Sequence, residues 1–242
     1  MSTTAVIQAR MSSSRLPGKV LLPLGGSTIL GWVVSAAARA KTVDQVVVAT
    51  SAEDSDDRVV AEARRLDVPV VRGPLTDVLD RYLVALKAHP SEIVVRLTAD
   101  CPFLDPRVID LCVETLASDS QLSLVTNVLV RTHPRGLDVE AVRSTALQKA
   151  AREAVGHHRA HVTSWLMTHP ADYTIAGVSS SLDAGDLRVT VDTTADLEVV
   201  TAVVSALGRD AQDADVLVPW LRAHPEIIAL NAHVEQKRED QG

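Results

Sequence analysis

AVIQARMSSSRLPGKVLLPLGG, residues 5–26, predicts a first β-strand, a basic loop and the approach to a helix. An apolar run that is typical of a buried strand leads into a small, polar loop that contains Gly and Pro. This loop carries Arg10, Arg15 and Lys19 and ends at two glycines, just before a helical pattern. Backbone N–H groups and a helix N-terminus point into a loop of this kind, so its position favours the binding of a phosphate chain.

A surface turn with solvated cations is the alternative interpretation of the same loop. The GxxxxGK[ST] motif of P-loop proteins does not occur in it, so the pattern alone leaves the ligand open. The charge distribution supports an anion, because the first 43 residues hold five cations and no acid although the whole chain has a net charge of −7. A basic loop on an acidic protein indicates a small polyphosphate rather than a long polyanion.

The overall composition is typical of a soluble globular protein, with 46% hydrophobic and 23% charged residues. Only 2% of the residues are aromatic, so the core must consist of Val, Leu, Ile and Ala, which in short runs favour buried strands. The acidic balance and the lack of interleaved basic and aromatic residues argue against nucleic acid as a main partner.

No secretion signal and no membrane segment are expected. The start, MSTTAVIQAR, lacks a charged n-region and a long apolar stretch, and no run approaches the roughly 18 apolar residues of a membrane span. Cys101 and Cys112 are too few and too poorly spaced for a metal site or a disulfide framework. We therefore expect a reduced, cytoplasmic protein that does not bind membranes.

Strand and helix patterns alternate through the first half of the chain. Strands are expected at 5–7, 45–50, 68–73 and 92–100. Helices are expected over 29–40 with Ser27 as N-cap, over 53–66, from Pro74 to about 86, and over 105–117. This alternation predicts right-handed βαβ units and a parallel sheet, whose ligands bind beyond the carboxyl ends of the strands.

The second half has a different pattern. A strand is expected at 122–127, a turn-rich connection over 131–140, and helices at about 143–154 and 159–168. The segments 171–179 and 186–193 are expected to be strands, with antiparallel pairing as one option, and a capping-box-like pattern at 193–196 predicts the next helix. Tail helices are expected around 215–235, and EQKREDQG at the end of the chain is expected to be frayed and uninvolved.

We interpret residues 1–242 as a single domain. Within it, residues from about 128 to 185 are expected to form an excursion that covers the site or mediates self-association, and 236–242 form the frayed tail.

Asp100 and Asp192 each follow an apolar, strand-like run. Either residue alone is more typical of a turn or a helix cap than of a catalytic site. Together they suggest two carboxylates at one edge of the sheet, close to the polyphosphate. Two carboxylates about 4 Å apart repel each other by roughly 4 kcal/mol at an effective dielectric constant near 20, and a dication would remove that repulsion. Hard oxygen ligands of this kind favour Mg²⁺.

Two other groups of side chains have structural explanations. His157, His158 and His161 could include metal ligands, but no nearby Cys or paired acid completes a zinc site, so solvated or hydrogen-bonded histidines are the favoured interpretation. Cys101 could be a nucleophile, but no His/Asn arrangement is evident near it. We interpret it as a small buried residue.

The loop IQARMSSSRLPGKVLLPLGG closely resembles the signature loop of the cytidylyltransferase family, which includes CMP-KDO synthetases, CMP-acylneuraminate synthetases and SpsF-type proteins of spore-coat polysaccharide biosynthesis. The resemblance is closest to the SpsF-type branch and runs through most of the chain. Further motifs follow in that branch's order: VVVATSAEDSDD, VVRGPLTDVLDRY, VVRLTADCPFLDP, HPRGLDVE, HRAHVTSW and RVTVDTTADLE. Several ordered matches are far more specific than the loop alone.

The resemblance implies a Rossmann-like α/β nucleotidyltransferase fold of the nucleotide-diphospho-sugar transferase type, with a mostly parallel central sheet and a small inserted α+β excursion. It implies CTP and a small-molecule acceptor as substrates, Mg²⁺ as cofactor and a homodimer as the assembly. An acceptor oxygen would attack the α-phosphorus of CTP and release pyrophosphate. The nucleotide preference rests on this resemblance, and the acceptor is not identified by it.

The resemblance also implies roles for individual residues. Arg10, Arg15 and Lys19 would hold the triphosphate, with Lys19 stabilising charge at the α-phosphate, while Asp100 and Asp192 would hold Mg²⁺. The other residues expected to contact the nucleotide are Gln8, Ala9, Thr50, Ser51, Arg72, Thr98 and Ala99. The residues expected to face the acceptor are Arg135, Gly136, Leu137, Asp138, Glu140 and His161.

The chain departs from the branch's usual Arg-Glu-His-Val-Thr-Pro pattern, because residues 159–164 are RAHVTS and Ala160 replaces the acid. Loss of that charge makes an anionic acceptor, such as a phosphonate, more attractive than the branch's usual sugar. Two alternatives remain open. A glycosyltransferase that uses a nucleotide-sugar donor would normally carry a DxD motif at a strand end. A nucleotide-binding protein without catalysis would not need to retain Lys19, Asp100 and Asp192.

Overall fold

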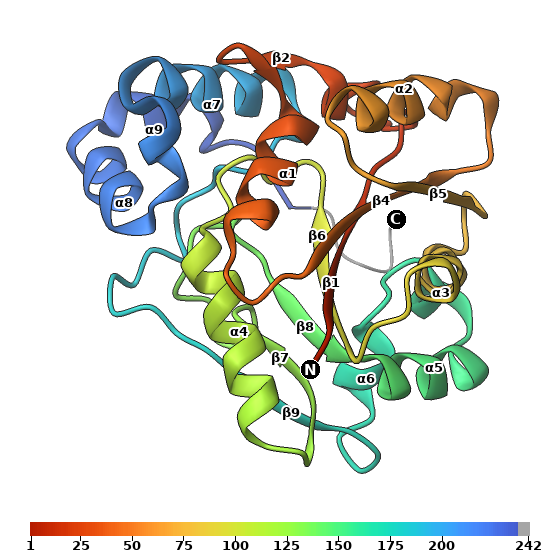
Figure 1. Cartoon of the computed structure of the whole chain (residues 1–242). Coiled ribbons are helices and arrows are strands. Elements are labelled where there is room, and N and C mark those ends of the chain that lie inside the picture. The colour runs from red at the N-terminus through yellow and green to blue at the C-terminus, as the bar shows by residue number, and fades with distance from the viewer. Residues whose placement is uncertain (237–242) are drawn as a thin grey trace.

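A seven-stranded sheet forms the centre of the computed structural model, which describes residues 1–236 (Figure 1). The strand order is β5-β4-β1-β6-β8-β7-β9. The strands are β1 (Thr3–Gln8), β4 (Gln45–Ser51), β5 (Val70–Gly73), β6 (Ile93–Thr98), β7 (Leu122–Thr126), β8 (Glu140–Arg143) and β9 (Thr174–Gly177). Only the two pairings that β8 makes within this sheet are antiparallel. The expected, mostly parallel sheet is therefore confirmed.

Helices cover both faces of this sheet, which explains why its strands are continuously apolar. On one face lie α1 (Ile29–Arg39), α2 (Asp57–Arg65) and α4 (Pro106–Ser118), and on the other lie α3 (Val78–Ala88), α5 (Ser144–Glu153) and α6 (Ser164–Thr168). Alternate residues of β1 show the division: Ala5 and Ile7 pack on the first face, and Val6 packs on the second.

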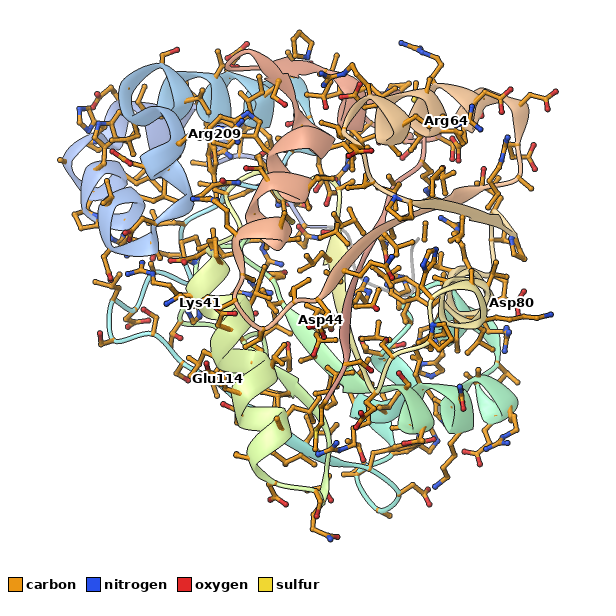
Figure 2. All side chains as sticks on the ribbon, in the orientation of Figure 1. Lys41, Asp44, Arg64, Asp80, Glu114 and Arg209 are labelled. Carbon is orange, nitrogen blue, oxygen red and sulfur yellow. The ribbon has the colours of Figure 1, made fainter. Side chains whose placement is uncertain are left out.

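A third group of helices packs beside α1 rather than on the sheet. It consists of α7 (Thr194–Leu207), α8 (Ala214–Ala223) and α9 (Pro225–Asn231), and its apolar contacts include Trp32 and Phe103. Arg64 on α2 and Glu114 on α4 are examples of exposed charged side chains on the outer sides of the helices (Figure 2). No helix within residues 1–236 is long and apolar enough to cross a membrane.

The capping-box prediction at 193–196 is confirmed, because the Thr193 and Asp196 side chains cap α7 reciprocally. Two other predicted helix starts are wrong. Helix α1 is capped by Thr28, whose hydroxyl accepts from the Gly31 N–H at 3.0 Å, while Ser27 pairs with Leu24 in a short antiparallel ladder. Helix α3 does not begin at Pro74.

Helix α3 instead begins at Val78, where Asp77 accepts from the Asp80 N–H at 2.9 Å. Pro74 stays in the preceding loop because the buried Arg81 guanidinium binds its carbonyl oxygen at 3.0 and 3.1 Å. The buried arginine therefore holds the loop open over positions where the sequence suggested a first helical turn.

The second half differs most from the prediction. Strand β8 was not predicted, and it enters the central sheet between β6 and β7. Segment 171–179 contains β9, which pairs in parallel with β7, while 186–193 forms only an isolated bridge between Arg188 and Arg135. The 128–185 segment thus supplies two strands of the main sheet, and its expected role in covering the site or in self-association stays a prediction.

Candidate active site

The basic loop folds back on itself at Gly18. Its φ of 72° is in the left-handed region that glycine adopts readily, and its N–H donates to the Met11 carbonyl at 2.9 Å. The chain then enters a 3₁₀ turn, Lys19–Leu21, in which Lys19 and Val20 are buried. This turn directs the Lys19 side chain inward.

Lys19 brings the two predicted carboxylates together. Its Nζ lies 2.6 Å from Asp100 Oδ2 and 2.7 Å from Asp192 Oδ1. The backbone supports the same arrangement, because the Val191 N–H donates to the Asp100 carbonyl at 2.9 Å and so joins the segment after β6 to the segment before α7. Although burial alone would lower the pKa of Lys19, the charges of Asp100 and Asp192 raise it above its usual value.

Two arginines hold the other oxygen of Asp192. Arg15 Nη2 lies 2.9 Å and Arg188 Nη2 lies 2.8 Å from Asp192 Oδ2. Burial acts to raise the pKa of Asp192, but Lys19, Arg15 and Arg188 outweigh it and lower that pKa to about 2. Arg188 also pairs with Asp196 at 2.8 Å, so the capping residue of α7 fixes the arginine that fixes Asp192.

Sequence reasoning did not single out Arg188 for the site. Its position four residues before Asp192 is the only signal that the sequence offers. The sequence also showed no sign of contacts from the end of the chain, where Glu235 and Gln236 were expected to be uninvolved. The Glu235 carbonyl accepts from Arg15 at 3.3 Å, and the Gln236 side chain accepts from Arg188 at 2.7 Å. The rest of the expected frayed tail, 237–242, lies outside the described residues.

A buried carboxylate ties the loop to the neighbouring strand. Asp56, the residue directly before α2, accepts from the Met11 N–H at 2.7 Å with Oδ1. Its Oδ2 accepts from the Thr50 hydroxyl at 2.9 Å and from the N–H and hydroxyl of Ser51 at 2.9 and 2.5 Å. Burial would raise the pKa of Asp56, but these hydrogen bonds lower it.

Thr50 and Ser51 therefore point at Asp56 and position the loop, and their predicted contact with the nucleotide stays a prediction. The same holds for Arg72. Its guanidinium donates to the carbonyls of Ser51 and Glu53 at 3.0 and 2.7 Å and pairs with Asp57 at 2.5 Å.

A second buried network joins the end of β1 to α6. Arg96 on β6 donates to the Gln8 side-chain oxygen at 3.2 Å and forms an ion pair with Glu140. Glu140 in turn accepts from the Thr163 hydroxyl at 2.9 Å. The Glu140 carboxylate, predicted to face the acceptor, is thus engaged inside the protein, and it connects a donor-side residue with the acceptor-side segment.

The remaining predicted residues lie around these networks. Arg10 is exposed at the start of the loop, while Ala9 and Ala99 are buried and extend the ladder by bonds of 3.1 Å to β4 and β1. Thr98 approaches Cys101, with Oγ1 and Sγ 3.1 Å apart. The His161 carbonyl accepts from the Ser164 N–H at 2.7 Å.

The segment 133–140 packs closely against 188–191. Gly136 has a φ of 112°, and a Cβ there would lie 2.5 Å from the Thr190 nitrogen, so only glycine fits. Leu137 is fully buried. Asp138 pairs with Arg131 at 2.8 Å, and burial lowers the pKa of Arg135.

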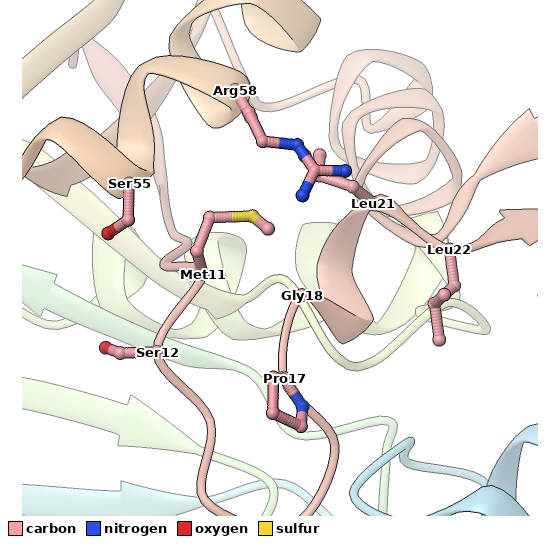
Figure 3. A pocket seen from close by; sticks show the side chains of 8 residues that line it. All are labelled: Met11, Ser12, Pro17, Gly18, Leu21, Leu22, Ser55 and Arg58. Atoms are coloured by element: carbon pink, nitrogen blue, oxygen red, sulfur yellow. The ribbon is translucent and has the colours of Figure 1, made fainter.

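Two cavities flank the basic loop. One of about 390 Å³ lies between the loop and α2, and Met11 and Arg58 project toward it from opposite sides (Figure 3). The other, of about 450 Å³, lies between Arg15, the start of α7 and residues 233–235. The basic loop is therefore accessible from both sides.

The donor set suits a hard dication such as Mg²⁺. Within residues 1–236, no group of three or more His, Cys, Asp and Glu side chains is arranged to hold a metal. Asp100 and Asp192, however, converge on a single cationic atom, and Mg²⁺ is commonly held by one or two carboxylates while keeping water and substrate phosphates as its other ligands. The two carboxylates therefore fit the ion.

Comparison with known proteins identifies relatives along nearly the whole chain. The family model described as Cytidylyltransferase matches residues 4–220. The chain is 34% identical to the spore coat polysaccharide biosynthesis protein SpsF of Bacillus subtilis over 230 residues, which are 91% of this chain and 94% of SpsF. It is 30% identical over 201 residues to a 3-deoxy-manno-octulosonate cytidylyltransferase of Anaeromyxobacter dehalogenans, covering 82% of this chain and 76% of the relative.

Solved structures agree with these matches. A cytidylyltransferase from Leptospira borgpetersenii has a TM-score of 0.89 and 31% identity, covering 98% of this chain and 100% of the other. CMP:2-keto-3-deoxy-manno-octonic acid synthetase in complex with CTP shares the fold, with a TM-score of 0.69 and 22% identity over 85% of this chain and 99% of the synthetase. The predicted nucleotidyltransferase fold is thereby confirmed. Because the family match includes the basic loop and both carboxylate segments, this chain belongs to the cytidylyltransferase family and is a CTP-dependent nucleotidyltransferase.

Proposed function

We propose that the protein transfers CMP from CTP to a small anionic acceptor, with release of pyrophosphate and dependence on Mg²⁺. The observation that carries this proposal is the opposition of cations and carboxylates across one site. Arg15 and Lys19 project from the basic loop and meet Asp100 and Asp192 at 2.6 to 2.9 Å. Such a site can hold a triphosphate from one side and its dication from the other.

The protein's part in the reaction is positioning and charge neutralisation. Arg10 and Arg15 hold the triphosphate, and Lys19 donates to an oxygen of the α-phosphate as charge builds there. An acceptor oxygen forms a bond to the α-phosphorus, the bond from that phosphorus to the bridging oxygen breaks, and pyrophosphate leaves with the electron pair. When bound, Mg²⁺ neutralises phosphate charge. Asp100 and Asp192 are the residues that would hold it.

An anionic acceptor, such as a sugar acid or a phosphonate, suits the acceptor side. Ala160 removes the acid that the resembling branch carries in this segment. Arg135 and Arg131 supply positive charge in the segment between β7 and β8, although Arg131 is already paired with Asp138. An acceptor that attacks through an oxyanion also needs no general base. Support for the sugar-acid class comes from similarity to relatives that are named 3-deoxy-manno-octulosonate cytidylyltransferases.

The test is a pyrophosphate-release assay with each nucleoside triphosphate against a panel of sugar acids, neutral sugars and small phosphonates. We expect turnover only with CTP, an anionic acceptor and Mg²⁺, and loss of turnover in Asp100→Asn. Activity with neutral sugars alone would refute the acceptor class. Turnover of a nucleotide-sugar donor would refute the reaction, and CTP binding without any turnover would indicate a binding protein.

We further infer a homodimer in a reducing, cytoplasmic location. Leu129 and Val130, in the connection from β7 to β8, are 47% and 66% exposed and offer an apolar surface for self-association. Cys101 and Cys112 are buried free thiols, which fits a reducing compartment. Light scattering of wild type and of Val130→Glu tests the dimer, which the charge should dissociate.

A further inference from the structure

The Lys19 ammonium and a divalent cation require the same place. Nζ lies 2.6 Å from one oxygen of Asp100 and 2.7 Å from one oxygen of Asp192. Mg²⁺ bound by these two carboxylates would bind oxygens at about 2.0–2.1 Å. Both cations cannot bridge the same pair of oxygens, because each needs the space between them.

Both side-chain oxygens of Asp192 are already paired with cations. Its Oδ2 is engaged by Arg15 and Arg188, at 2.9 and 2.8 Å. Its side chain is only 14% exposed, and that of Lys19 is 10% exposed. A dication that approached with Lys19 still in place would therefore meet three cations around one poorly solvated carboxylate, and the repulsion would be weakly screened.

Lys19 itself can leave this position. Its ammonium is a compact charge at the end of a flexible four-carbon stem, unlike the planar and pre-organised guanidinium of the neighbouring arginines. Its backbone sits in the basic loop, where a triphosphate would bind under the proposed function. A phosphate oxygen offers the ammonium a new anionic partner at the moment when the carboxylates gain a metal.

We propose that Lys19 is an internal competitor of the divalent cation: it closes the Asp100–Asp192 pair to metal until the triphosphate draws it away. Metal and nucleotide then bind cooperatively, and by linkage each raises the affinity for the other by the same factor. The role in the catalytic cycle rests on the proposed function, but the competition between the ammonium and the metal does not.

The experiment measures Mn²⁺ binding, as a spectroscopic probe for Mg²⁺, to the full-length protein without nucleotide. The signal of free Mn²⁺ is followed by electron paramagnetic resonance. Lys19→Met and Lys19→Gln remove the competing charge, and Lys19→Arg retains it. Lys87→Met is the matched control, since it removes one positive charge at an exposed position on α3. Circular dichroism verifies the fold of each variant.

We expect Lys19→Met and Lys19→Gln to bind Mn²⁺ at least about tenfold more tightly than wild type, because two close carboxylates lose their shared cation. Lys19→Arg and Lys87→Met should match wild type, and adding Asp100→Asn to Lys19→Met should abolish the gain. Equal Mn²⁺ affinity in wild type and in both neutral variants would overturn the proposal, as would an equal gain in Lys19→Arg or Lys87→Met. None of these measurements depends on turnover, so failure of the proposed reaction would be seen separately in the pyrophosphate assay.

Discussion

Replacing Asp56 by Asn should both loosen the basic loop and lower the stability of the protein. Asp56 is buried and accepts four hydrogen bonds, at 2.7, 2.9, 2.9 and 2.5 Å. An asparagine retains one acceptor oxygen, and turning that oxygen toward the three donors of Thr50 and Ser51 preserves most of these bonds, so the Met11 N–H is the donor left without a partner. Leaving one buried donor unpaired costs about 1–3 kcal/mol, so the free energy of unfolding should fall by roughly that amount.

Urea denaturation at pH 7 measures this change, with Asp57→Asn as the matched control. Asp57 is the next residue, but its side chain is 66% exposed and has one ion pair, with Arg72. An exposed pair contributes about 0–1 kcal/mol, so the control should be nearly neutral. Calorimetric titration should also show weaker CTP binding for Asp56→Asn, because the N–H of Met11 in the loop loses its anchor.

The pH dependence gives an independent check. The hydrogen bonds lower the pKa of Asp56 in the folded protein. A lowered pKa stabilises the fold at pH values above the carboxyl's ordinary value, and this contribution is lost as the pH falls through the folded-state value. The difference in unfolding free energy between wild type and Asp56→Asn should therefore shrink in acid. Equal stability at pH 7, or a difference that grows as the pH falls, would refute the role given to Asp56.

Three further predictions concern the acceptor side and the carboxylates. Glu140→Gln breaks the buried ion pair with Arg96 and should lower the free energy of unfolding, measured in urea, by about 3–5 kcal/mol. It should change kcat and the KM for the acceptor more than the KM for CTP, and an effect on the KM for CTP alone would contradict the proposed network. Gly136→Ala forces a Cβ to 2.5 Å from a backbone nitrogen and should lower the melting temperature clearly, whereas Gly156→Ala, with nothing within 4 Å, should lower it less; equal shifts would contradict the close approach. The pKa of Asp192 is lowered to about 2, so the stability that this carboxylate contributes should be complete above the ordinary carboxyl pKa near 4 and be lost as the pH falls toward 2. Asp192→Asn should therefore flatten the acid limb of the curve of unfolding free energy against pH, and an unchanged limb would contradict this.

Apolar runs predicted the central strands β1, β4 and β6 because most of their side chains are buried on both faces of the sheet. Segment 186–193 shows the limit of that signal. Leu187, Val189 and Val191 alternate and are buried, yet the segment pairs only through an isolated bridge at Arg188. Alternation reports which side chains are buried and not whether the backbone finds a partner strand. Strand β8 was not predicted because its sequence signal is short: the strand has four residues and runs directly into α5.

The sequence singled out those site residues whose charge and place in a local pattern are visible within one segment. Lys19 lies in a loop, Asp100 follows a strand and Asp192 follows a strand-like apolar run, and the structure brings the three together. Asp56 and Arg188 could not be found in this way. The role of Asp56 comes from a contact with Met11, which is distant in sequence, and that of Arg188 from an ion pair with Asp192, four residues later. In a run of acids such as EDSDD, residues 53–57, the sequence does not indicate which carboxylate is buried.

The charges of the site explain why the metal and the nucleotide should need each other. Lys19, Arg15 and Arg188 oppose Asp100, Asp192 and Asp196 in one connected set of ion pairs, so the set is balanced. A dication added alone leaves an excess of positive charge, and a triphosphate added alone leaves an excess of negative charge close to two carboxylates. Added together they offset much of each other's charge, and the exposed Arg10 can meet part of what remains. The balance therefore favours joint binding over either single event, with the movement of Lys19 as the step that couples them.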